Sequence, residues 1–511
     1  MPKSDTIHDV IVVGGGNAGL CAALRARESV DDVIVLEKAP EGKRGGNSFF
    51  TEGRMRIPHG DISDVAALLQ MDLDELANIE VEPYSEDDFY NDLQRASRYL
   101  ADEGLCRLIA TGARPGIEWL QSMGSKFHLA LGFDDIKSGE KIKLIGGDDL
   151  QHYEGGPGLV DALISQLGKH GVAIRYDTGA TRLLRGPDGI EGVEVRTADG
   201  VVETIRGHAV VLACGGFEAS PPLRNAYLGP GWDLAKVRGT EFNTGDGLTM
   251  AMEIGARAFG HWGGCHSVSA DYFADPFGDR VHGDISERVS YRFGITVNRD
   301  GKRYFDEGAD LRAFTYAVSG RNLVESANGF AVQIVDAKTV DMLRPVYRSR
   351  NVTQVVTDDI RVIAAELDLD ADNLVATVEQ YNAAVQDGDV DFAALDGKCT
   401  RGIEPRKSNW ALPLDTPPFT AFPVAPAITF TFGGLRTNTS GEVFDEGERV
   451  IAGLYAAGEM VGGIYYHNYP GGSGLVSGMV MGMAAGDSSS AYVVRRGKGQ
   501  KKSDVVEKMV G

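Results

Sequence analysis

The chain has 511 residues, of which 43% are hydrophobic, 24% charged and 8% aromatic, with 66 glycines and only 19 prolines. This composition excludes a disordered, collagenous or coiled-coil protein, and the length predicts about three structural lobes at roughly 150 residues each. Aspartate and glutamate outnumber lysine and arginine by 73 to 51, and the formal net charge of −22 would repel nucleic acid and anionic membranes. An anionic ligand must therefore be bound by a local structural feature, and not by the overall charge of the protein.

The five cysteines lie far apart, and none belongs to a CxxC pair or to a Cys/His cluster with zinc spacing. We therefore expect reduced thiols and no metal site. The amino terminus is polar and leads directly into an expected strand, without the apolar segment of a signal peptide. Because no stretch approaches the roughly 18 apolar residues of a membrane span, we expect a soluble, cytoplasmic protein.

Residues 7–13 form a short apolar run that ends at Gly14, which is typical of a buried parallel strand. Residues 17–28 then carry apolar side chains at helical spacing, and residues 33–36 predict a second strand. A strand, a glycine turn, a helix and a strand open a doubly wound parallel sheet.

From residue 172 the pattern changes to strands joined by tight turns, with Pro187-Asp188-Gly189 as one turn signal. This stretch ends in an apolar strand expected over residues 208–214. We interpret it as a β meander that returns the chain to the parallel sheet.

Residues 262–425 interleave aromatic and charged side chains and end in a proline-rich segment, so we interpret them as an inserted second domain. After it we expect a hairpin from residues 433–438 and 441–444, a strand that ends at Gly458, and a glycine-rich helix from Ser473. The predicted organisation is the first part of an α/β domain (1–261), the inserted domain (262–425), the second part of the α/β domain (426–495) and a basic tail (496–511).

The segment Gly14-Gly15-Gly16-Asn17-Ala18-Gly19 is a GxGxxG motif between a strand and a helix, which is the context the motif requires. Gly14 permits the tight turn, Gly16 lets the backbone approach a pyrophosphate, and Gly19 allows close packing of helix and strand. The helix amino terminus supplies the positive charge that an acidic protein otherwise lacks. Glu37 ends the second strand, where its carboxylate accepts hydrogen bonds from ribose hydroxyls and disfavours a 2′-phosphate.

A second glycine-rich loop, Lys43-Arg44-Gly45-Gly46-Asn47-Ser48, follows the second strand and favours FAD over NAD, because a flavin has a longer body. Near the carboxyl end, residues 453–459 predict a strand and turn, and Gly471-Gly472-Ser473-Gly474-Leu475 opens a helix. The free amides of that helix would stabilise the negative charge that reduction places on a flavin.

These motifs, together with ACGG at residues 213–216, NTGDG at 243–247, VNRDGKRYFDE at 297–307 and LYAAGEMVGGIYYHNYPGGSG at 454–474, resemble the fumarate reductase/succinate dehydrogenase flavoprotein superfamily over nearly the whole chain. The closest resemblance is to the soluble tricarballylate dehydrogenase-like branch, a relative of the 3-ketosteroid dehydrogenases. The resemblance implies a Rossmann-like FAD-binding domain with a parallel sheet and β meander, built from both ends of the chain. An inserted α+β cap, the substrate domain, closes over the flavin.

The resemblance assigns FAD contacts to Gly14, Gly16, Asn17, Ala18, Gly19, Glu37, Lys38, Gly45, Gly46, Asn47, Ser48, Ala180, Gly215, Asp246, Gly458, Glu459, Ser473 and Leu475. In membrane-bound members a histidine near GGNS is joined covalently to the flavin. Here Arg44 precedes the two glycines and no histidine stands close in sequence, so we predict noncovalent FAD.

A flavin between two domains accepts a hydride from a C–H bond next to a carbonyl or carboxylate when a protein group removes the neighbouring proton. The product carries a C=C bond. The superfamily uses this geometry in both directions, so the sequence does not fix the direction.

Two candidate catalytic residues follow from the resemblance. Arg312 falls near the proton-donating arginine of fumarate reductases, one residue farther from Glu307 than in those enzymes. It could instead be a cap arginine paired with Glu307 or Asp310. His266 matches a family histidine that touches a substrate carboxylate, and its alternative is a structural role in a loop.

Fumarate reductases have an arginine at the position of Tyr469 and a histidine at that of Thr429, which argues against a small dicarboxylate substrate. In ketosteroid dehydrogenases a tyrosine before Pro-Gly donates to the substrate carbonyl, and Tyr469 matches it. His467 is a candidate base or relay because imidazole titrates near neutral pH. Tyr316 is a further candidate, and packing around the flavin is the alternative for each of these residues.

Our first hypothesis is an FAD-dependent dehydrogenase that desaturates a C–C bond beside a carbonyl or carboxylate in a small organic acid or cyclic ketone. The second is a soluble enoate reductase of fumarate reductase type, and the third is an electron-transfer flavoprotein without its own turnover. The electron acceptor is not identified by the sequence.

Overall fold

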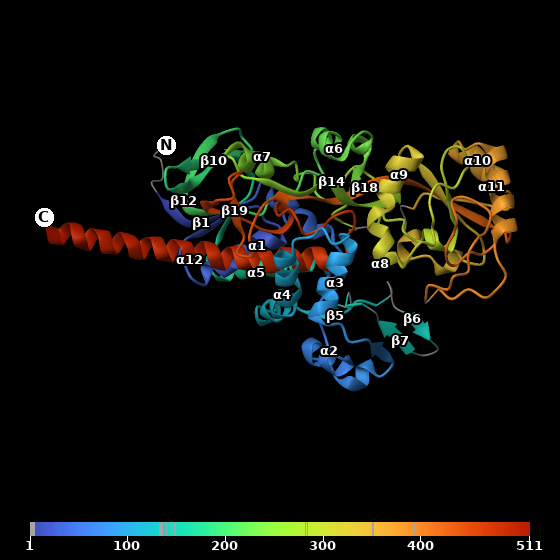
Figure 1. The fold of residues 1–511 in the computed structure, drawn as a ribbon, viewed down its shortest axis with the longest axis horizontal. Helices are drawn as coiled ribbons and strands as arrows, with labels where there is room; N and C mark the ends of the chain where they lie inside the picture. Colours follow the sequence, from blue (N-terminus) through green and yellow to red (C-terminus); the bar gives the residue numbers. More distant parts are fainter. Residues whose placement is uncertain are drawn as a thin grey trace.

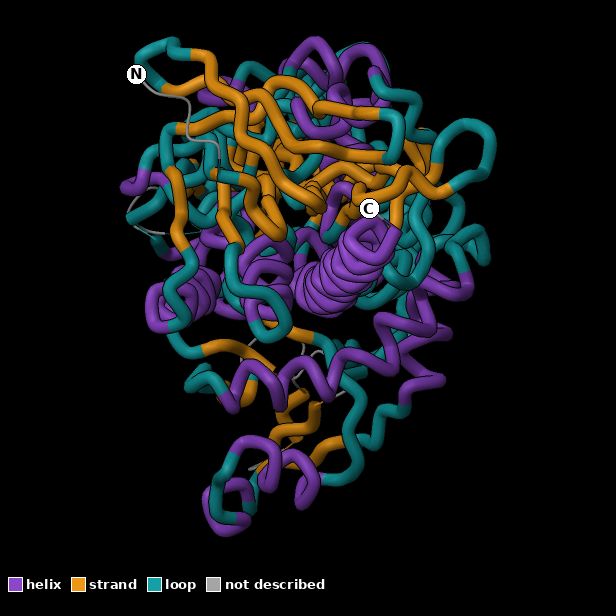
Figure 2. Tube along the Cα trace, turned by 90° about the vertical axis from the view of Figure 1, so that its left-hand side faces the viewer, coloured by secondary structure: helices purple, strands orange, loops and turns teal. Residues whose placement is uncertain are grey.

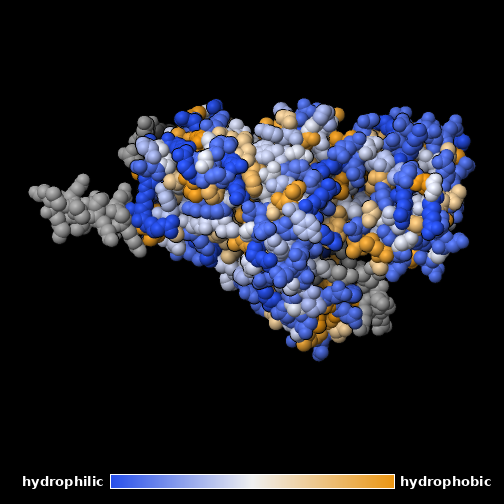
Figure 3. Space-filling view, in the orientation of Figure 1, coloured by the Kyte–Doolittle hydropathy of each residue, from blue (hydrophilic) through white to orange (hydrophobic). Residues whose placement is uncertain are grey.

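The computed structural model describes residues 6–131, 136–138, 141–144, 146–147, 150–281, 283, 285–349, 352–392 and 394–510. Figure 1 shows an elongated molecule, with the blue and green amino-terminal elements and the red carboxyl-terminal helix at one end and the yellow and orange segments at the other. A smaller lobe with α2, β6 and β7 hangs below the middle. The face seen in Figure 3 is mainly hydrophilic, as expected for a strongly charged chain.

An eight-stranded sheet forms one half of the molecule, and its spatial order is β10-β11-β12-β1-β2-β9, with β20 paired to β12 and β19 to β20. The strands are β1 (Ile7–Val13), β2 (Val33–Leu36), β9 (Ala173–Arg175), β10 (Thr178–Gly186), β11 (Gly189–Thr197), β12 (Val202–Leu212), β19 (Glu442–Phe444) and β20 (Val450–Ala456). The pairs β1/β2, β1/β12, β2/β9 and β12/β20 are parallel, whereas β10, β11 and β12 form an antiparallel meander. The predicted parallel sheet with a β meander is confirmed.

The second half is built on a six-stranded sheet of order β13-β18-β16-β15, in which β14 and β17 also pair with β18. The strands are β13 (Lys236–Val237), β14 (Ala258–Asp271), β15 (Ile295–Val297), β16 (Ala331–Val335), β17 (Val355–Thr357) and β18 (Phe419–Leu435). The predicted domain divisions at 261/262 and 425/426 fall inside β14 and β18, two long paired strands that run from one half into the other. The division of the chain into domains stays a prediction.

Two small sheets complete the strands: β3 (Arg54–Met55), β5 (Phe127–Leu129) and β8 (Leu150–His152) in one, and β4 (Ile79–Val81), β6 (Ile136–Ser138) and β7 (Lys141–Leu144) in the other. The α-helices are α1 (Asn17–Arg27), α2 (Ile62–Leu69), α3 (Glu86–Ala96), α4 (Glu103–Ser122), α5 (Gly155–Lys169), α6 (Pro221–Leu228), α7 (Asp246–Glu253), α8 (Arg312–Thr315), α9 (Ser319–Ala327), α10 (Ile360–Leu367), α11 (Ala371–Ala384) and α12 (Ser473–Val510). Among the described residues, no helix combines the length and the apolar character that a membrane span requires.

Local sequence explains why β1 and α1 form where they do. Val10 to Val13 are apolar and buried because β1 is covered by strands on both edges and by helices on a face, which suits an uninterrupted apolar run. Helix α12 packs on α1, and both run along the same side of the sheet (Figure 2). This packing is close because α12 is rich in glycine: a Cβ at Gly482 would lie 2.3 Å from the carbonyl oxygen of Ala18.

Two segments near the carboxyl end compare with the sequence predictions as follows. The expected hairpin of residues 433–438 with 441–444 forms in its inner part, where Thr437 and Val443 make an antiparallel bridge. The Phe444 amide donates to the carbonyl oxygen of Arg436 at 3.0 Å, and the Asn438 amide donates to that of Glu442 at 3.2 Å. Residues 433–435 instead end β18 and pair with β14, and β19 also pairs with β20. Helix α12 continues through the predicted basic tail to Val510 and projects from the body (Figure 1).

Candidate functional site

One continuous cavity runs between the carboxyl edge of the parallel sheet and the second half of the molecule. Its wall at one end comes from the turn after β1, the end of β2 and the loop at residues 46–48. Its middle is lined by residues 213–215, 243–244 and 246–247, and its far end by side chains of the cap and of the loop before α12. Both ends of the chain and the inserted segment therefore line one cavity.

Most of the predicted cofactor residues lie on this wall: Gly14, Gly16, Asn17, Ala18, Glu37, Lys38, Gly46, Asn47, Ser48, Ala180, Gly215, Asp246, Gly458, Glu459 and Leu475. The other three lie behind it. Gly19 has a packing role, since a Cβ there would lie 2.0 Å from the carbonyl oxygen of Gly14. Gly45 has φ +99 and faces Val160, and the buried Ser473 donates through Oγ to the carbonyl oxygen of Pro470 at 2.7 Å.

The glycine turn shows why the cavity suits a dinucleotide. At Gly14, φ is +109 and a Cβ would lie 2.3 Å from the carbonyl oxygen of Ala213, so glycine is required by the fold itself. At Gly16 the nearest atom to an added Cβ is Ser48 Oγ at 3.6 Å, so a side chain there would not clash with the protein. Gly16 instead leaves space on the cavity side of the α1 amino terminus, where a pyrophosphate can approach the backbone amides.

Glu37 connects the turn to the end of β2. Its Oε2 accepts a hydrogen bond from the Gly15 amide and its Oε1 accepts one from the Ala39 amide, both at 2.7 Å. Burial raises the pKa of this carboxyl, and the two amides oppose that shift. Each oxygen retains acceptor capacity for a ribose hydroxyl, so the side chain fits the predicted role and also stabilises the turn.

The first and last segments of the chain meet at Asn17. Its backbone amide donates to Ser48 Oγ at 3.1 Å, and its side-chain Nδ2 donates to the carbonyl oxygen of Leu475 at 2.7 Å. These two hydrogen bonds tie the amino-terminal motif to the second glycine-rich loop and to the start of α12. The residues present therefore fit a bound FAD that is held by distant segments of the chain.

A buried pair of carboxyl groups, Glu218 and Glu459, lies beside the middle of the cavity, and sequence analysis missed the pairing. Glu218 Oε1 accepts hydrogen bonds from the Nδ2 atoms of Asn47 and Asn243, each at 2.6 Å. Glu459 Oε1 accepts from the Thr431 amide at 2.7 Å. Burial and then the charge of Glu459 raise the pKa of Glu218 well above its ordinary value, and burial also raises the pKa of Glu459.

The far end of the cavity has an aromatic wall. The ring of His266 lies 4.9 Å from that of Tyr469, 5.1 Å from Tyr316 and 5.3 Å from Phe430, measured between ring centroids. His266 is 3% exposed, and within the described part of the chain both of its ring nitrogens are buried without a hydrogen-bond partner. Burial lowers its pKa well below the ordinary value, so the imidazole is neutral and can donate one hydrogen bond to a ligand.

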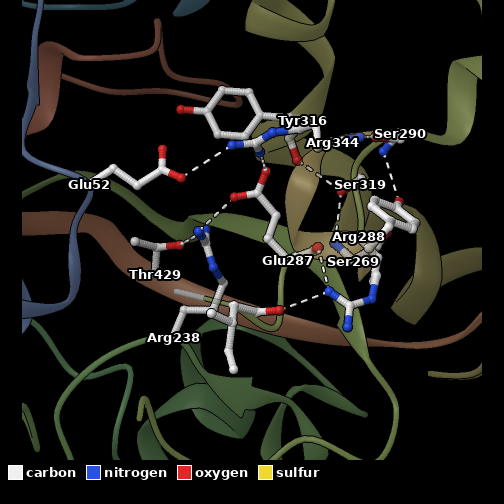
Figure 4. Close-up of polar contacts among 12 residues, drawn as sticks. Glu52, Arg238, Ser269, Glu287, Arg288, Ser290, Tyr316, Ser319, Arg344 and Thr429 are labelled. Atoms are coloured by element: carbon white, nitrogen blue, oxygen red, sulfur yellow. Dashed lines mark hydrogen bonds and ion pairs between the residues drawn. The ribbon is translucent and has the colours of Figure 1, made fainter. Parts of the chain in front are cut away.

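Next to Tyr316, the residues around the cavity form a chain of alternating charges (Figure 4). Glu52 pairs with Arg344 Nη2 at 3.2 Å, Arg344 also pairs with Glu287, and Arg238 Nη2 lies 2.9 Å from Glu287 Oε2. Arg238 Nη1 donates to Thr429 Oγ1 at 2.9 Å. Burial alone would raise the pKa of Glu287, but Arg344 and Arg238 outweigh it and lower the pKa to about 2.

Sequence analysis did not single out Glu52, Arg238, Glu287 or Arg344. Glu52 and Arg344 are 292 residues apart, and neither belongs to a short motif, so no local pattern could have paired them. Arg238 places a cation beside Thr429, the position where the resemblance indicated a missing histidine.

Arg312 and Tyr316 lie on the cavity wall, at the start of α8 and directly after it. The Arg312 guanidinium lies 5.1 Å from the centre of the Tyr316 ring. The Glu307 carboxylate, one of the two alternative partners of Arg312 beside Asp310, is paired with Arg303. Arg312 therefore belongs to the candidate site through its place in the cavity lining.

His467, the predicted base or relay, is not among the residues that line this cavity. Its backbone adopts φ +61, and its amide donates to His261 Nδ1 at 3.1 Å. The two imidazoles are 4.7 Å apart, outside the cavity lining. The physical reason is the left-handed turn, which directs His467 toward His261 while Tyr469, two residues later, faces the cavity.

Residues 9–476 match the family described as FAD binding domain. The chain belongs to this FAD-binding family. Its cofactor is therefore FAD, and the predicted membership of the fumarate reductase/succinate dehydrogenase flavoprotein superfamily is confirmed.

Two relatives are informative. NADH:fumarate oxidoreductase of Klebsiella pneumoniae is 25% identical over 96% of this chain and 48% of its own length. A probable fumarate reductase of Shewanella frigidimarina is 28% identical over 95% of this chain and 75% of its own length. The chain thus spans about half of the first relative and three quarters of the second.

Two solved structures share the fold. The open conformation of a flavocytochrome c3 fumarate reductase has a TM-score of 0.72 at 25% identity, covering 96% of this chain and 79% of that one. A 3-ketosteroid delta1-dehydrogenase from Sterolibacterium denitrificans also has a TM-score of 0.72, at 21% identity, covering 95% of this chain and 99% of that one. The Rossmann-like FAD-binding fold with an inserted cap is confirmed.

Proposed function

We propose that this chain is an FAD-dependent oxidoreductase of CH–CH bonds, and that it desaturates a C–C bond beside a carbonyl or carboxylate of a small organic acid or cyclic ketone. The observation that carries this proposal is the composition of one cavity wall. His266, Tyr316, Arg312 and Tyr469 line the far end of the same cavity whose other end carries the dinucleotide motif. Bound FAD would supply hydride acceptance or donation at its N5 atom.

His266, Tyr469 and Arg312 have separable roles in this chemistry. The neutral His266 donates a hydrogen bond to a substrate oxygen. The Tyr469 hydroxyl oxygen accepts from the Gly474 amide at 3.4 Å, which polarises its O–H toward a substrate carbonyl and stabilises the enolate formed as the α-proton leaves. Arg312 is placed to bind a carboxylate or to exchange a proton with the substrate.

A second candidate is the reverse reaction, reduction of an enoate. It is favoured by the names of the relatives, which describe NADH:fumarate oxidoreductase and fumarate reductase. Arg312, Arg238 and Arg344 all line the cavity wall, so an unsaturated acid would also find cations there. An electron-transfer protein without turnover is the third alternative, and no feature of the site favours it.

Anaerobic spectroscopy separates these candidates. The holoenzyme is mixed with saturated acids and cyclic ketones in one series, and the dithionite-reduced enzyme with the matching unsaturated compounds in another. Bleaching of the oxidised flavin in the first series supports desaturation. Reoxidation of the reduced flavin in the second series, at a rate higher than that of the bleaching, supports reduction. If neither series changes the spectrum while FAD stays bound, the electron-transfer alternative replaces the proposal.

A further inference from the structure

The candidate catalytic side chains at the far end of the cavity come from two segments that are far apart in the sequence. Arg312 and Tyr316 belong to the short helix α8 and the turn after it, within the inserted segment. Tyr469 belongs to the loop before α12, which is part of the FAD-binding half. The relative position of these side chains therefore depends on contacts between α8 and that loop.

Asn468 makes such a contact. Its Nδ2 donates to the carbonyl oxygen of Phe314 in α8 at 2.7 Å, and its Oδ1 accepts from the backbone amide of Tyr469 at 2.8 Å. Reversing the side-chain amide would set its oxygen against a carbonyl oxygen and its NH₂ against an N–H, so the two hydrogen bonds fix one orientation. A single side chain thus bonds to the backbone of Tyr469 and to the helix that begins with Arg312.

The other end of the loop is held on the FAD-binding side. The buried Arg56 donates through Nε to the carbonyl oxygen of Gly471 at 2.7 Å and through its amide to that of Gly472 at 3.0 Å. Tyr469 therefore stands between an anchor to its own half at residues 471–472 and a tether to the cap at Asn468. Helix α8 has only four residues, so its own backbone hydrogen bonds constrain it weakly.

We propose that Asn468 is a positioning residue that holds Arg312 and Tyr469 in register across the junction of the cap and the FAD-binding half. This inference rests on the proposed function for its effect on catalysis. A misplacement of about 1 Å between reacting groups can cost on the order of a hundredfold in rate. Removal of the tether thus lowers kcat while FAD stays bound.

The test is the Asn468→Asp variant, which keeps the acceptor for the Tyr469 amide and removes the donor to Phe314. Asn382→Asp is the matched control, because Asn382 Nδ2 also donates to a backbone carbonyl, that of Leu414 at 3.0 Å, and its Oδ1 accepts the Leu414 amide at 2.7 Å, away from the cavity. We expect N468D to lower kcat by about tenfold or more with unchanged FAD content, and N382D to leave kcat unchanged.

A pH profile adds a readout that a merely structural role would not move. The carboxyl group introduced in N468D regains a donor when it is protonated, so the ratio of N468D to wild-type kcat rises as the pH falls toward about 4. Hydrogen exchange gives a measurement without substrate: the amides of residues 311–318 exchange several-fold faster in N468D holoenzyme than in wild type.

The outcomes distinguish this inference from the proposed function. If wild-type holoenzyme turns over no saturated or unsaturated compound, the proposed function fails, and the exchange measurement alone decides the tether. Faster exchange at residues 311–318 in N468D but not in N382D supports it. Unchanged exchange in N468D, or an equal fall of kcat in N382D, overturns it.

Discussion

Substitution of Gly16 by alanine separates cofactor binding from folding. At this position φ is −83, which alanine adopts freely, and the new Cβ would lie 3.6 Å from Ser48 Oγ and 3.8 Å from the Gly45 carbonyl oxygen, both ordinary separations. We expect the free energy of unfolding of the apoprotein to change by less than about 1 kcal/mol. The methyl group occupies the space through which a pyrophosphate reaches the α1 amides.

The weaker binding of FAD follows from the hydrogen bonds that this methyl group blocks. A hydrogen bond to a charged group contributes roughly 1.5–3 kcal/mol, so blocking one weakens FAD binding about tenfold to a hundredfold. Gly14→Ala is the contrasting variant, because its Cβ would lie 2.3 Å from the backbone oxygen of Ala213 and its φ is +109. We expect Gly14→Ala to lower the apoprotein's unfolding free energy by several kcal/mol, more than the ~1–3 kcal/mol of backbone strain alone.

The assay has two parts: titration of apoprotein with FAD followed by flavin fluorescence, and urea unfolding of the same apoprotein. The reasoning is refuted if Gly16→Ala binds FAD within twofold of wild type. It is also refuted if that variant destabilises the apoprotein as much as Gly14→Ala does.

Three further predictions concern the far end of the cavity and the cofactor. Tyr469→Phe keeps its FAD but slows flavin reduction by a saturated substrate about a hundredfold, as measured by anaerobic stopped flow, because an oxyanion donor is removed; an unchanged rate would remove Tyr469 from the chemistry. Glu287→Gln leaves Arg238 and Arg344 without their shared carboxylate and lowers the unfolding free energy at neutral pH by about 3–5 kcal/mol in urea titrations. The folded-state pKa of Glu287 is lowered to about 2. The stabilisation that this carboxylate contributes is therefore complete above its ordinary pKa of about 4.5 and is lost as the pH falls toward 2. A wild-type thermal midpoint that falls no faster than that of Glu287→Gln between pH 4.5 and 2 would contradict the assignment. Acid precipitation releases all FAD into the supernatant, because we predict a noncovalent cofactor, and yellow protein in the pellet would disprove that prediction.

The fold and the cofactor end of the site could be predicted because their signals are local. The turn at Gly14, the packing at Gly19 and the acidic end of β2 at Glu37 each act within a few residues of the strand that carries them. The β meander was predictable for the same reason, since tight turns join its strands. The hairpin at 433–444 was predictable only in its inner part, where Thr437 bridges Val443, because residues 433–435 belong to the long β18 and pair with β14, more than 150 residues earlier.

The substrate end was less predictable because tertiary contacts build it. Glu52, Arg238, Glu287 and Arg344 come from four separate segments, and only the folded chain shows that they pair. His467 was placed in the site by its position in a motif, but a left-handed turn directs it to His261.

The central claim is that both ends of this chain and the inserted cap enclose one FAD. The visible absorption spectrum of the purified holoprotein, combined with the amount of FAD released per chain, tests it most directly. We predict an oxidised-flavin spectrum and one FAD for each polypeptide. A colourless protein that remains colourless after incubation with FAD would contradict the account.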